Sequence, residues 1–209
     1  MYKKKISKKI FAGILSLSVF ILPLNLIKSN QFEFKQIETK QWSIVKKRCQ
    51  NLKASQNFTY PKNIKGAILV TKDNLTGLVP FVGHAAIVVN SHQVVQASPF
   101  GGVHYGPNDW DTSKITCYAV VPKHTTQKNR IDSAIWAQNQ IGKNYNVFFN
   151  LWENPNAKSF YCSQIIWAAY YNECNIDIAP SRPMILFPVH LLSDSKTTDL
   201  IYYKDDAYE

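Results

Sequence analysis

The residue that could do chemistry in this sequence is Cys162, which opens an apolar run compatible with a helix. Apolar side chains recur through the run at helical spacing: Ile165, Ile166, Ala169 and Tyr170. A thiol in the first turn of a helix meets unpaired backbone N–H groups and the positive end of the helix dipole, which favour the nucleophilic thiolate. The alternative is a buried structural cysteine, because cysteine is among the residues most often found inside proteins.

A cysteine nucleophile needs a base, and His84 is the best candidate. It follows Gly83 and opens an apolar strand, so its ring lies at the end of a buried element. A hairpin that closes near Ser91 pairs positions whose numbers sum to about 180, which places Gln96 opposite His84. An amide oxygen there can accept the imidazole N–H and fix the tautomer. The alternatives are a core histidine bonded to backbone and a glutamine that faces water.

The remaining polar residues do not form another familiar site. We expect four further histidines to be solvated: His92, His104, His124 and His190. The sequence has no C-x-x-C pair and no clustered ligands at zinc-site spacing, so we predict neither a metal nor a cofactor. A G-x-S-x-G motif and a phosphate-binding loop are also absent.

The first 29 residues are typical of an export signal or an N-terminal membrane anchor. Six lysines precede Gln31 with no acidic residue among them: Lys3, Lys4, Lys5, Lys8, Lys9 and Lys28. The apolar core Ile10–Leu22 follows, without a clear Ala-x-Ala cleavage site. We therefore expect an exported protein, either secreted or held on the outer face of the cytoplasmic membrane.

The positive charge of the chain is concentrated in this leader. Removing its six lysines from the net charge of +10 leaves +4. No basic stripe interleaved with aromatic residues follows, so we predict no binding to nucleic acid.

The rest of the chain divides into a helical segment, residues 30–60, and one domain, residues 61–209. Residues 32–55, 130–141 and the run after Cys162 predict helices, the last capped by Asn156 or Ser159. Five segments predict strands: 66–71, 83–89, 93–98, 115–121 and 200–203. Residues 99–102 predict a loop. This order indicates an α+β fold with helices packed on an antiparallel sheet.

Four cysteines are few for an exported chain: Cys49, Cys117, Cys162 and Cys174. We expect mostly free, buried thiols, because a domain of this size does not need disulfides for stability. A disulfide from Cys117 to Cys49 or to Cys174 remains an alternative.

Five segments taken in order carry a family resemblance: 66–71, 83–88, 95–97, 142–145 and 161–170. The sequence resembles the circularly permuted NlpC-type, papain-like cysteine hydrolases, above all the YiiX/YebB-like branch and more distantly the lecithin:retinol acyltransferases. As in that group, the cysteine follows the histidine. The resemblance implies a papain-like fold, an antiparallel sheet or small barrel packed against helices, with the catalytic cysteine at a helix N-terminus.

The resemblance also implies roles for individual residues. Cys162 matches the nucleophile, His84 the base and Gln96 the third polar residue, a place often taken by Glu in this branch. A glutamine carries no charge to stabilise an imidazolium, although amides orient the histidine in papain-like enzymes generally. Contacts to substrate are expected from three further residues: Tyr145, Tyr161 and Ser163.

The implied function is that of a thiol peptidase or amidase that works through a thioester, with cell-wall peptides such as the peptidoglycan stem as the first substrate to consider. A second reading is a lipid or N-acyl amide hydrolase or acyltransferase at the membrane, with the aromatic stretch 145–152 lining an apolar channel. A third is an inactive papain-like module that only binds.

Overall fold

The computed structural model describes residues 35–36, 38–52, 59–73, 83–147, 157–180 and 185–205. A compact unit extends from Lys40 to Glu209. The predicted leader and most of the aromatic stretch 145–152, from residue 148 onward, lie outside the described residues. Within the described part of the chain, no helix has the length and apolar character needed to cross a membrane.

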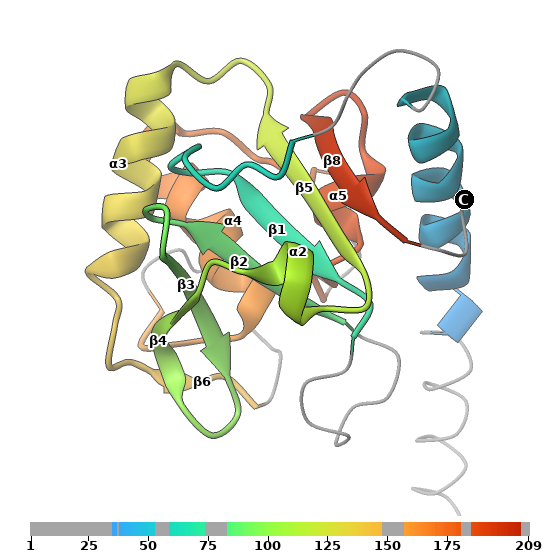
Figure 1. Cartoon of the computed structure of the whole chain (residues 1–209). Helices are drawn as coiled ribbons and strands as arrows, with labels where there is room; N and C mark the ends of the chain where they lie inside the picture. The colour runs from blue at the N-terminus through green and yellow to red at the C-terminus, as the bar shows by residue number, and fades with distance from the viewer. Residues whose placement is uncertain are drawn as a thin grey trace, which may run out of the picture. The chain divides into compact units, whose positions relative to one another are not determined.

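A six-stranded antiparallel sheet forms the centre of the fold, with the strand order β4-β3-β2-β1-β5-β8 (Figure 1). Its strands are β1 (Ile68–Thr71), β2 (His84–Val88), β3 (Gln93–Ser98), β4 (Gly102–Pro107), β5 (Cys117–Pro122) and β8 (Thr198–Lys204). A separate parallel pair joins β6 (Asn144–Tyr145) to β7 (Ser159–Phe160). The described architecture is therefore α+β, as the sequence predicted.

Helices lie on both sides of this sheet. Helices α3 (Gln127–Gln138) and α4 (Cys162–Cys174) pack together, with α4 behind the sheet and α3 at its left in Figure 1. The short helix α2 (Trp110–Ser113) lies on the front face, and α5 (His190–Ser193) packs near β5 and β8. A helix was also predicted over residues 32–55. Of that segment the structure describes residues 35–36 and 38–52, and all of them are helical.

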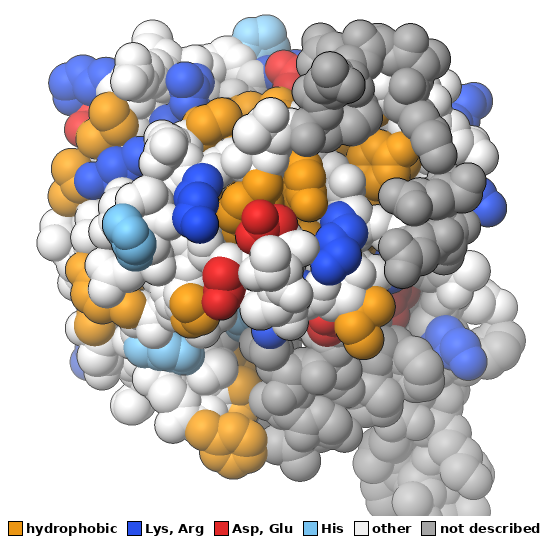
Figure 2. All heavy atoms as spheres, in the orientation of Figure 1, with side chains coloured by type: hydrophobic (Ala, Val, Ile, Leu, Met, Phe, Trp, Pro, Cys, Tyr) orange, Lys and Arg blue, Asp and Glu red, His pale blue; other side chains and the backbone are white. Residues whose placement is uncertain are grey.

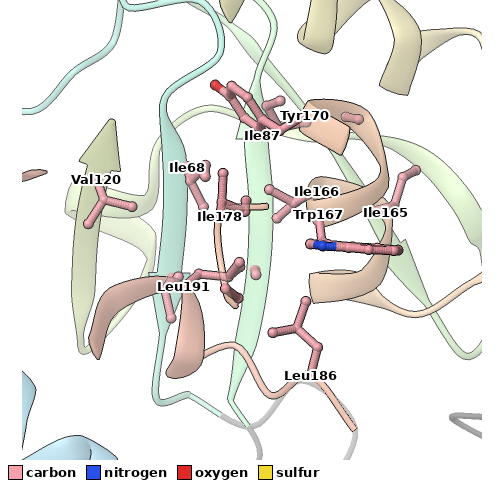
Figure 3. Close-up of a cluster of buried hydrophobic side chains, with 14 of the residues drawn as sticks. Ile68, Ile87, Val120, Ile165, Ile166, Trp167, Tyr170, Ile178, Leu186 and Leu191 are labelled. Atoms are coloured by element: carbon pink, nitrogen blue, oxygen red, sulfur yellow. The ribbon is translucent and has the colours of Figure 1, made fainter. Parts of the chain in front are cut away.

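The main core fills the space between the sheet and α4, where Ile68 and Ile87 of the sheet meet Ile166 of the helix (Figure 3). A smaller apolar cluster lies on the opposite face around Trp110. Side chains of β2 alternate between the two, with Ala85 and Ile87 in the main core and Ala86 and Val88 in the smaller cluster. Both faces of β2 are buried, which explains its continuous apolar sequence.

Most predicted elements are confirmed, with ends that differ from the predicted ones by up to three residues. Helix α3 begins three residues before the predicted start because Thr126 and Asn129 form a reciprocal capping box. Strand β4 was predicted in part as a loop, since Gly102, Gly106 and Pro107 are poor strand formers. Pairing with β3 along its whole length overrides that local preference.

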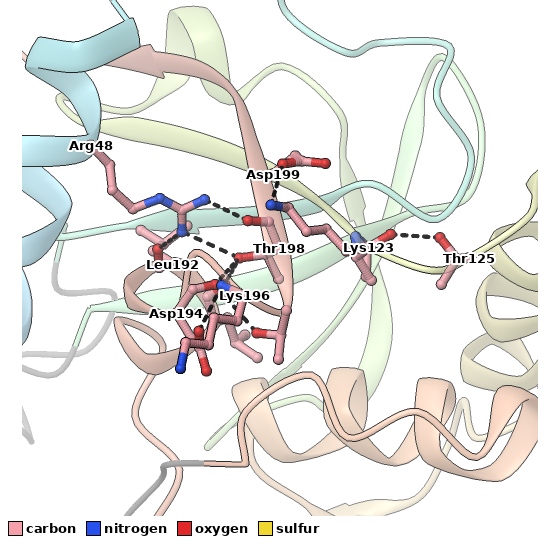
Figure 4. A network of polar contacts seen from close by, with 11 residues as sticks. Arg48, Lys123, Thr125, Leu192, Asp194, Lys196, Thr198 and Asp199 are labelled. Carbon is pink, nitrogen blue, oxygen red and sulfur yellow. Dashed lines mark hydrogen bonds and ion pairs between the residues drawn. The ribbon is translucent and has the colours of Figure 1, made fainter.

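A charged side chain fastens the helix of residues 38–52 to the far edge of the sheet (Figure 4). Arg48 donates to the Leu192 carbonyl oxygen, to the Thr198 carbonyl oxygen at 2.6 Å and to Thr198 Oγ1 at 3.3 Å. These contacts, which we call the Arg48 cluster, join that helix to α5 and β8. Burial lowers the pKa of the Arg48 guanidinium, and the nearby Asp199 and Asp194 oppose the shift.

Charges on the face that carries α2 are mixed in sign. Figure 2 shows acidic and basic side chains interspersed with apolar groups near the middle of this view. The view therefore contains no broad surface of a single charge on its described atoms.

Candidate active site

The first turn of α4 places Cys162 at the N-terminus of a buried helix. Tyr161 is the N-cap residue with an extended backbone (φ −95°, ψ 170°), and the Asn156 or Ser159 cap predicted from sequence is wrong. Ser159 lies in β7 instead. Gln164 accepts a hydrogen bond from the Tyr161 backbone N–H at 3.3 Å and a second from Asn146 at 3.3 Å. These bonds fix where the helix begins and so where the sulfur lies.

Two neighbours of the cysteine hold the segment 185–190 against this helix end. The Ser163 hydroxyl donates to the Leu186 carbonyl at 2.5 Å, and the Leu186 N–H donates to the Tyr161 hydroxyl oxygen at 3.2 Å. Both side chains are buried. Their contribution in the structure is to position α4, and the predicted contacts of Tyr161 and Ser163 with substrate stay a prediction.

The predicted base and its predicted partner are joined by a hydrogen bond. His84 Nε2 lies 2.8 Å from Gln96 Oε1. The register differs by two residues from the prediction, since Gln96 pairs with Ala86, so that the long Gln96 side chain reaches His84 along the diagonal. Gly83 has φ +68°, and a Cβ there would lie 2.3 Å from the Thr71 carbonyl oxygen, so the turn into β2 requires glycine.

Helix α4, which Cys162 begins, packs against β2. The backbone N–H of Ala85, the residue after His84, is one of the groups that act to lower the pKa of the Cys162 thiol. Among the described residues, no hydrogen bond joins the His84 imidazole to the Cys162 sulfur. Hydrogen bonds between catalytic groups are often long when no substrate is bound. Gln96 engages Nε2 of His84, so Nδ1 is the ring nitrogen outside this bond.

Burial dominates the protonation of both groups. It raises the pKa of the Cys162 thiol above its ordinary value, while the N–H groups of Ala85 and Ser163 oppose the rise. Burial lowers the pKa of His84 to about 4. The hydrogen bond to Gln96 opposes this shift, whereas Lys114 and His104 add to it with smaller effects. The predicted resting thiolate is therefore not what the structure favours. At neutral pH these two groups are therefore a thiol and a neutral imidazole, because desolvation outweighs the helix dipole.

One further side chain lies near each of these two groups. The His84 ring stacks on Trp110, with centroids 5.6 Å apart and planes 29° apart. Tyr145 is half-buried on β6, and burial together with the nearby Cys162 and Tyr161 raises the pKa of its phenol. Tyr145 thus lies near the sulfur, where the sequence predicted a contact with substrate.

His104 is one of two histidines that the sequence analysis placed wrongly. It was expected to be solvated, but its Nε2 lies 3.1 Å from Gln96 Nε2 and its Nδ1 lies 3.0 Å from the Gly102 carbonyl oxygen. The signal that could have found it is the alternation of β4, which places position 104 opposite Gln96 once that strand is recognised.

Three other histidines lie away from this group. His92 and His124 are exposed, as predicted. The expectation for His190 is wrong, because it is 4% exposed and its Nδ1 accepts the Phe187 N–H at 2.9 Å. Burial alone lowers its pKa to about 4, because a charged ring would be desolvated there.

The cysteines and possible metal ligands complete the description of the site. All four cysteines are free thiols, and Cys174 alone is half-buried. Within the described ranges, no three His, Cys, Asp or Glu side chains converge as metal ligands would.

A cysteine at a helix N-terminus, packed on an antiparallel sheet that carries a histidine and its amide partner, defines a papain-like cysteine hydrolase. The sequence model of the permuted papain-like amidase enzymes, the YaeF/YiiX or C92 family, matches residues 64–186. The match covers more than half of the chain, so the protein belongs to this family of cysteine peptidases and amidases.

A solved structure shows the same fold. The crystal structure described as the metalloprotein yiiX from Escherichia coli O157:H7 is similar with a TM-score of 0.53 and 16% sequence identity. The similarity covers 69% of this chain and 99% of that one. No curated protein matches the sequence.

Proposed function

We propose that the protein is an exported amidase or peptidase that cleaves amide bonds of cell-wall peptides, with Cys162 as nucleophile, His84 as base and Gln96 as its orienting partner. The observation that carries the proposal is the packing of α4 against β2: the backbone N–H of the residue after His84 lowers the pKa of the Cys162 thiol, and His84 is bonded to Gln96. The basic and apolar leader supports export, and membership of an amidase family supports the bond type.

The proposed reaction begins with a neutral pair and transfers one proton. Nδ1 of His84 takes the Cys162 proton as the sulfur attacks the amide carbonyl carbon, and the carbonyl electrons move onto oxygen. The backbone N–H of Cys162, in a helix turn whose N–H groups have no partner within the helix, can donate to that oxygen. The C–N bond then breaks, and the imidazolium returns its proton to the leaving amine.

Hydrolysis of the thioester completes the cycle. His84 removes a proton from water, whose oxygen attacks the thioester carbon, and the C–S bond breaks with the proton returning to sulfur. Tyr145, whose phenol is affected by the nearby Cys162, is the side chain that we propose contacts the acyl group. A lipid or N-acyl amide substrate would use the same steps, so the substrate has to be identified by experiment.

The test compares muropeptides with long-chain N-acyl amides as substrates for the full chain and for Cys162→Ser. We expect release of amine from muropeptides by the wild type and a loss of roughly 10³-fold or more in Cys162→Ser. Cys174→Ser, which removes the half-buried thiol, is the control and should keep full activity. Cleavage of N-acyl amides alone would favour a lipid or N-acyl amide hydrolase at the membrane. Equal inactivity of the wild type and all variants would favour a module that only binds.

A further inference from the structure

The bonds of Gln96 continue past it to a second histidine, and their donors and acceptors can be assigned in sequence. The Gly102 carbonyl oxygen can only accept, so His104 Nδ1, 3.0 Å away, carries the proton. In a neutral ring His104 Nε2 then has a lone pair. The nitrogen of the Gln96 amide, 3.1 Å away, donates to it.

This assignment decides which end of the amide faces His84. With its nitrogen committed to His104, Gln96 presents Oε1 to His84 Nε2 at 2.8 Å. An oxygen acceptor requires the proton on Nε2, which leaves the lone pair on Nδ1 for the thiol proton. A rotated amide would present its NH₂ group instead and would favour the opposite tautomer, with Nδ1 protonated and unable to act as base.

Strand β4 is shaped to hold the amide in this orientation. His104 pairs directly with Gln96 across β3 and β4. Gly106 lies two residues further on the same face, and a Cβ there would come within 2.5 Å of Gln96 Nε2. The amide therefore lies over a position where any other residue would displace it.

We propose that His104 is a positioning residue: it orients the Gln96 amide and thereby holds His84 in the tautomer that can accept the thiol proton. The inference rests on the proposed roles of Cys162 and His84. The proposal also explains how an amide, that of Gln96, can serve as the third polar residue of the site beside Cys162 and His84. A carboxylate has two equivalent oxygens and needs no such orientation. An amide has one oxygen and one NH₂ group, and only the orientation that presents the oxygen to His84 favours the required tautomer.

The first test reads the tautomer directly and does not depend on activity. ¹⁵N-histidine NMR of the full chain at neutral pH should show His84 with the proton on Nε2. In His104→Phe, which removes the acceptor but keeps a ring, we expect a mixture of tautomers. An unchanged Nε2–H tautomer in His104→Phe would overturn the proposal, even if the protein proved to have no hydrolase activity.

The second test uses the rate of Cys162 alkylation by iodoacetamide and the hydrolysis of p-nitrophenyl acetate. We expect His104→Phe to slow both by about tenfold, roughly the effect of losing one orienting hydrogen bond. His104→Gln, which keeps an acceptor, should recover part of the rate. Gly106→Ala should slow both reactions because its Cβ pushes on the amide.

The decisive comparison is made with Gln96→Glu. In that background His104→Phe should have almost no further effect, because a carboxylate presents an oxygen to His84 either way round. An equal loss in both backgrounds would assign His104 a purely structural role and refute the proposal. His92→Phe, at an exposed turn, is the control, and total inactivity of the wild type would count against the proposed function rather than against the tautomer assignment.

Discussion

Two polar regions lie toward opposite edges of the six-stranded sheet and are built from different kinds of groups. On β2, β3 and β4, His84, Gln96 and His104 form what we call the polar row, joined by bonds between uncharged rings and an amide. Near β8, the Arg48 cluster uses a guanidinium that grips backbone carbonyls.

The difference shows two uses of buried polar groups. The Arg48 cluster satisfies carbonyl oxygens and joins two helices to a strand, so its contribution is to stability. In the proposed assignment the polar row determines which ring nitrogen of His84 carries the proton, so replacing one member should change which nitrogen can act as a base. We therefore expect mutations in the polar row to change catalysis more than stability, and mutations in the Arg48 cluster to do the reverse.

The largest effect should come from His84→Phe, which keeps a ring against Trp110 but removes the base. We expect kcat to fall by about 10³-fold, within the usual contribution of general base catalysis. Thermal unfolding measured on the same samples should change little. His92→Phe is the matched control, and a large loss of stability with retained kcat per folded molecule would reverse the contrast between the two regions.

A smaller effect, on stability, is expected from Arg48→Met. The change removes the donors to Leu192 and Thr198 and should lower the free energy of unfolding by about 2 to 3 kcal/mol in urea titrations. Lys47→Met, an exposed position one residue away, should leave it unchanged. A reduced turnover in Arg48→Met at full folding would show that the two regions are coupled.

The smallest expected effect concerns the pH dependence of the free energy of unfolding. His84 and His190 both have their pKa lowered to about 4 by burial, so between about pH 6.5 and 4 the unfolded chain binds protons that the folded chain does not. The free energy of unfolding should therefore fall with falling pH across this window, by about 1.4 kcal/mol per pH unit for each histidine. Their contribution is fully present above that window.

His190→Asn, which keeps an acceptor for the Phe187 N–H, should make the pH dependence shallower by one histidine's share, measured by urea unfolding at several pH values. His124→Asn, at an exposed position, should leave the slope as it is. An unchanged slope in His190→Asn would mean that this ring is not held neutral in the folded protein.

The sequence was sufficient for the parts of the site that follow a local pattern. Apolar periodicity located the helix after Cys162, and alternation located the strands that carry His84 and Gln96. It was not sufficient for β4, whose glycines and proline obscure the pattern, and His104 was lost with that strand. The register of the β2–β3 hairpin was predicted two residues away, because a turn's sequence does not fix where the ladder begins.

Sequence patterns also could not predict the protonation state of Cys162. A cysteine in the first helical turn suggests a thiolate, but the degree of burial depends on how β2, Tyr145 and the segment 185–190 close around it. Desolvation is a property of the assembled fold, and here it outweighs the local electrostatic preference.

The order of the segments along the chain has a consequence for synthesis. His84, Gln96 and His104 leave the ribosome well before Cys162, and β8, which completes the sheet beside β5, is made last. A nascent or prematurely terminated chain therefore holds the base and its partners without the sulfur. We therefore expect a chain that ends before residue 162 to lack hydrolase activity, because it has no thiol at the proposed site.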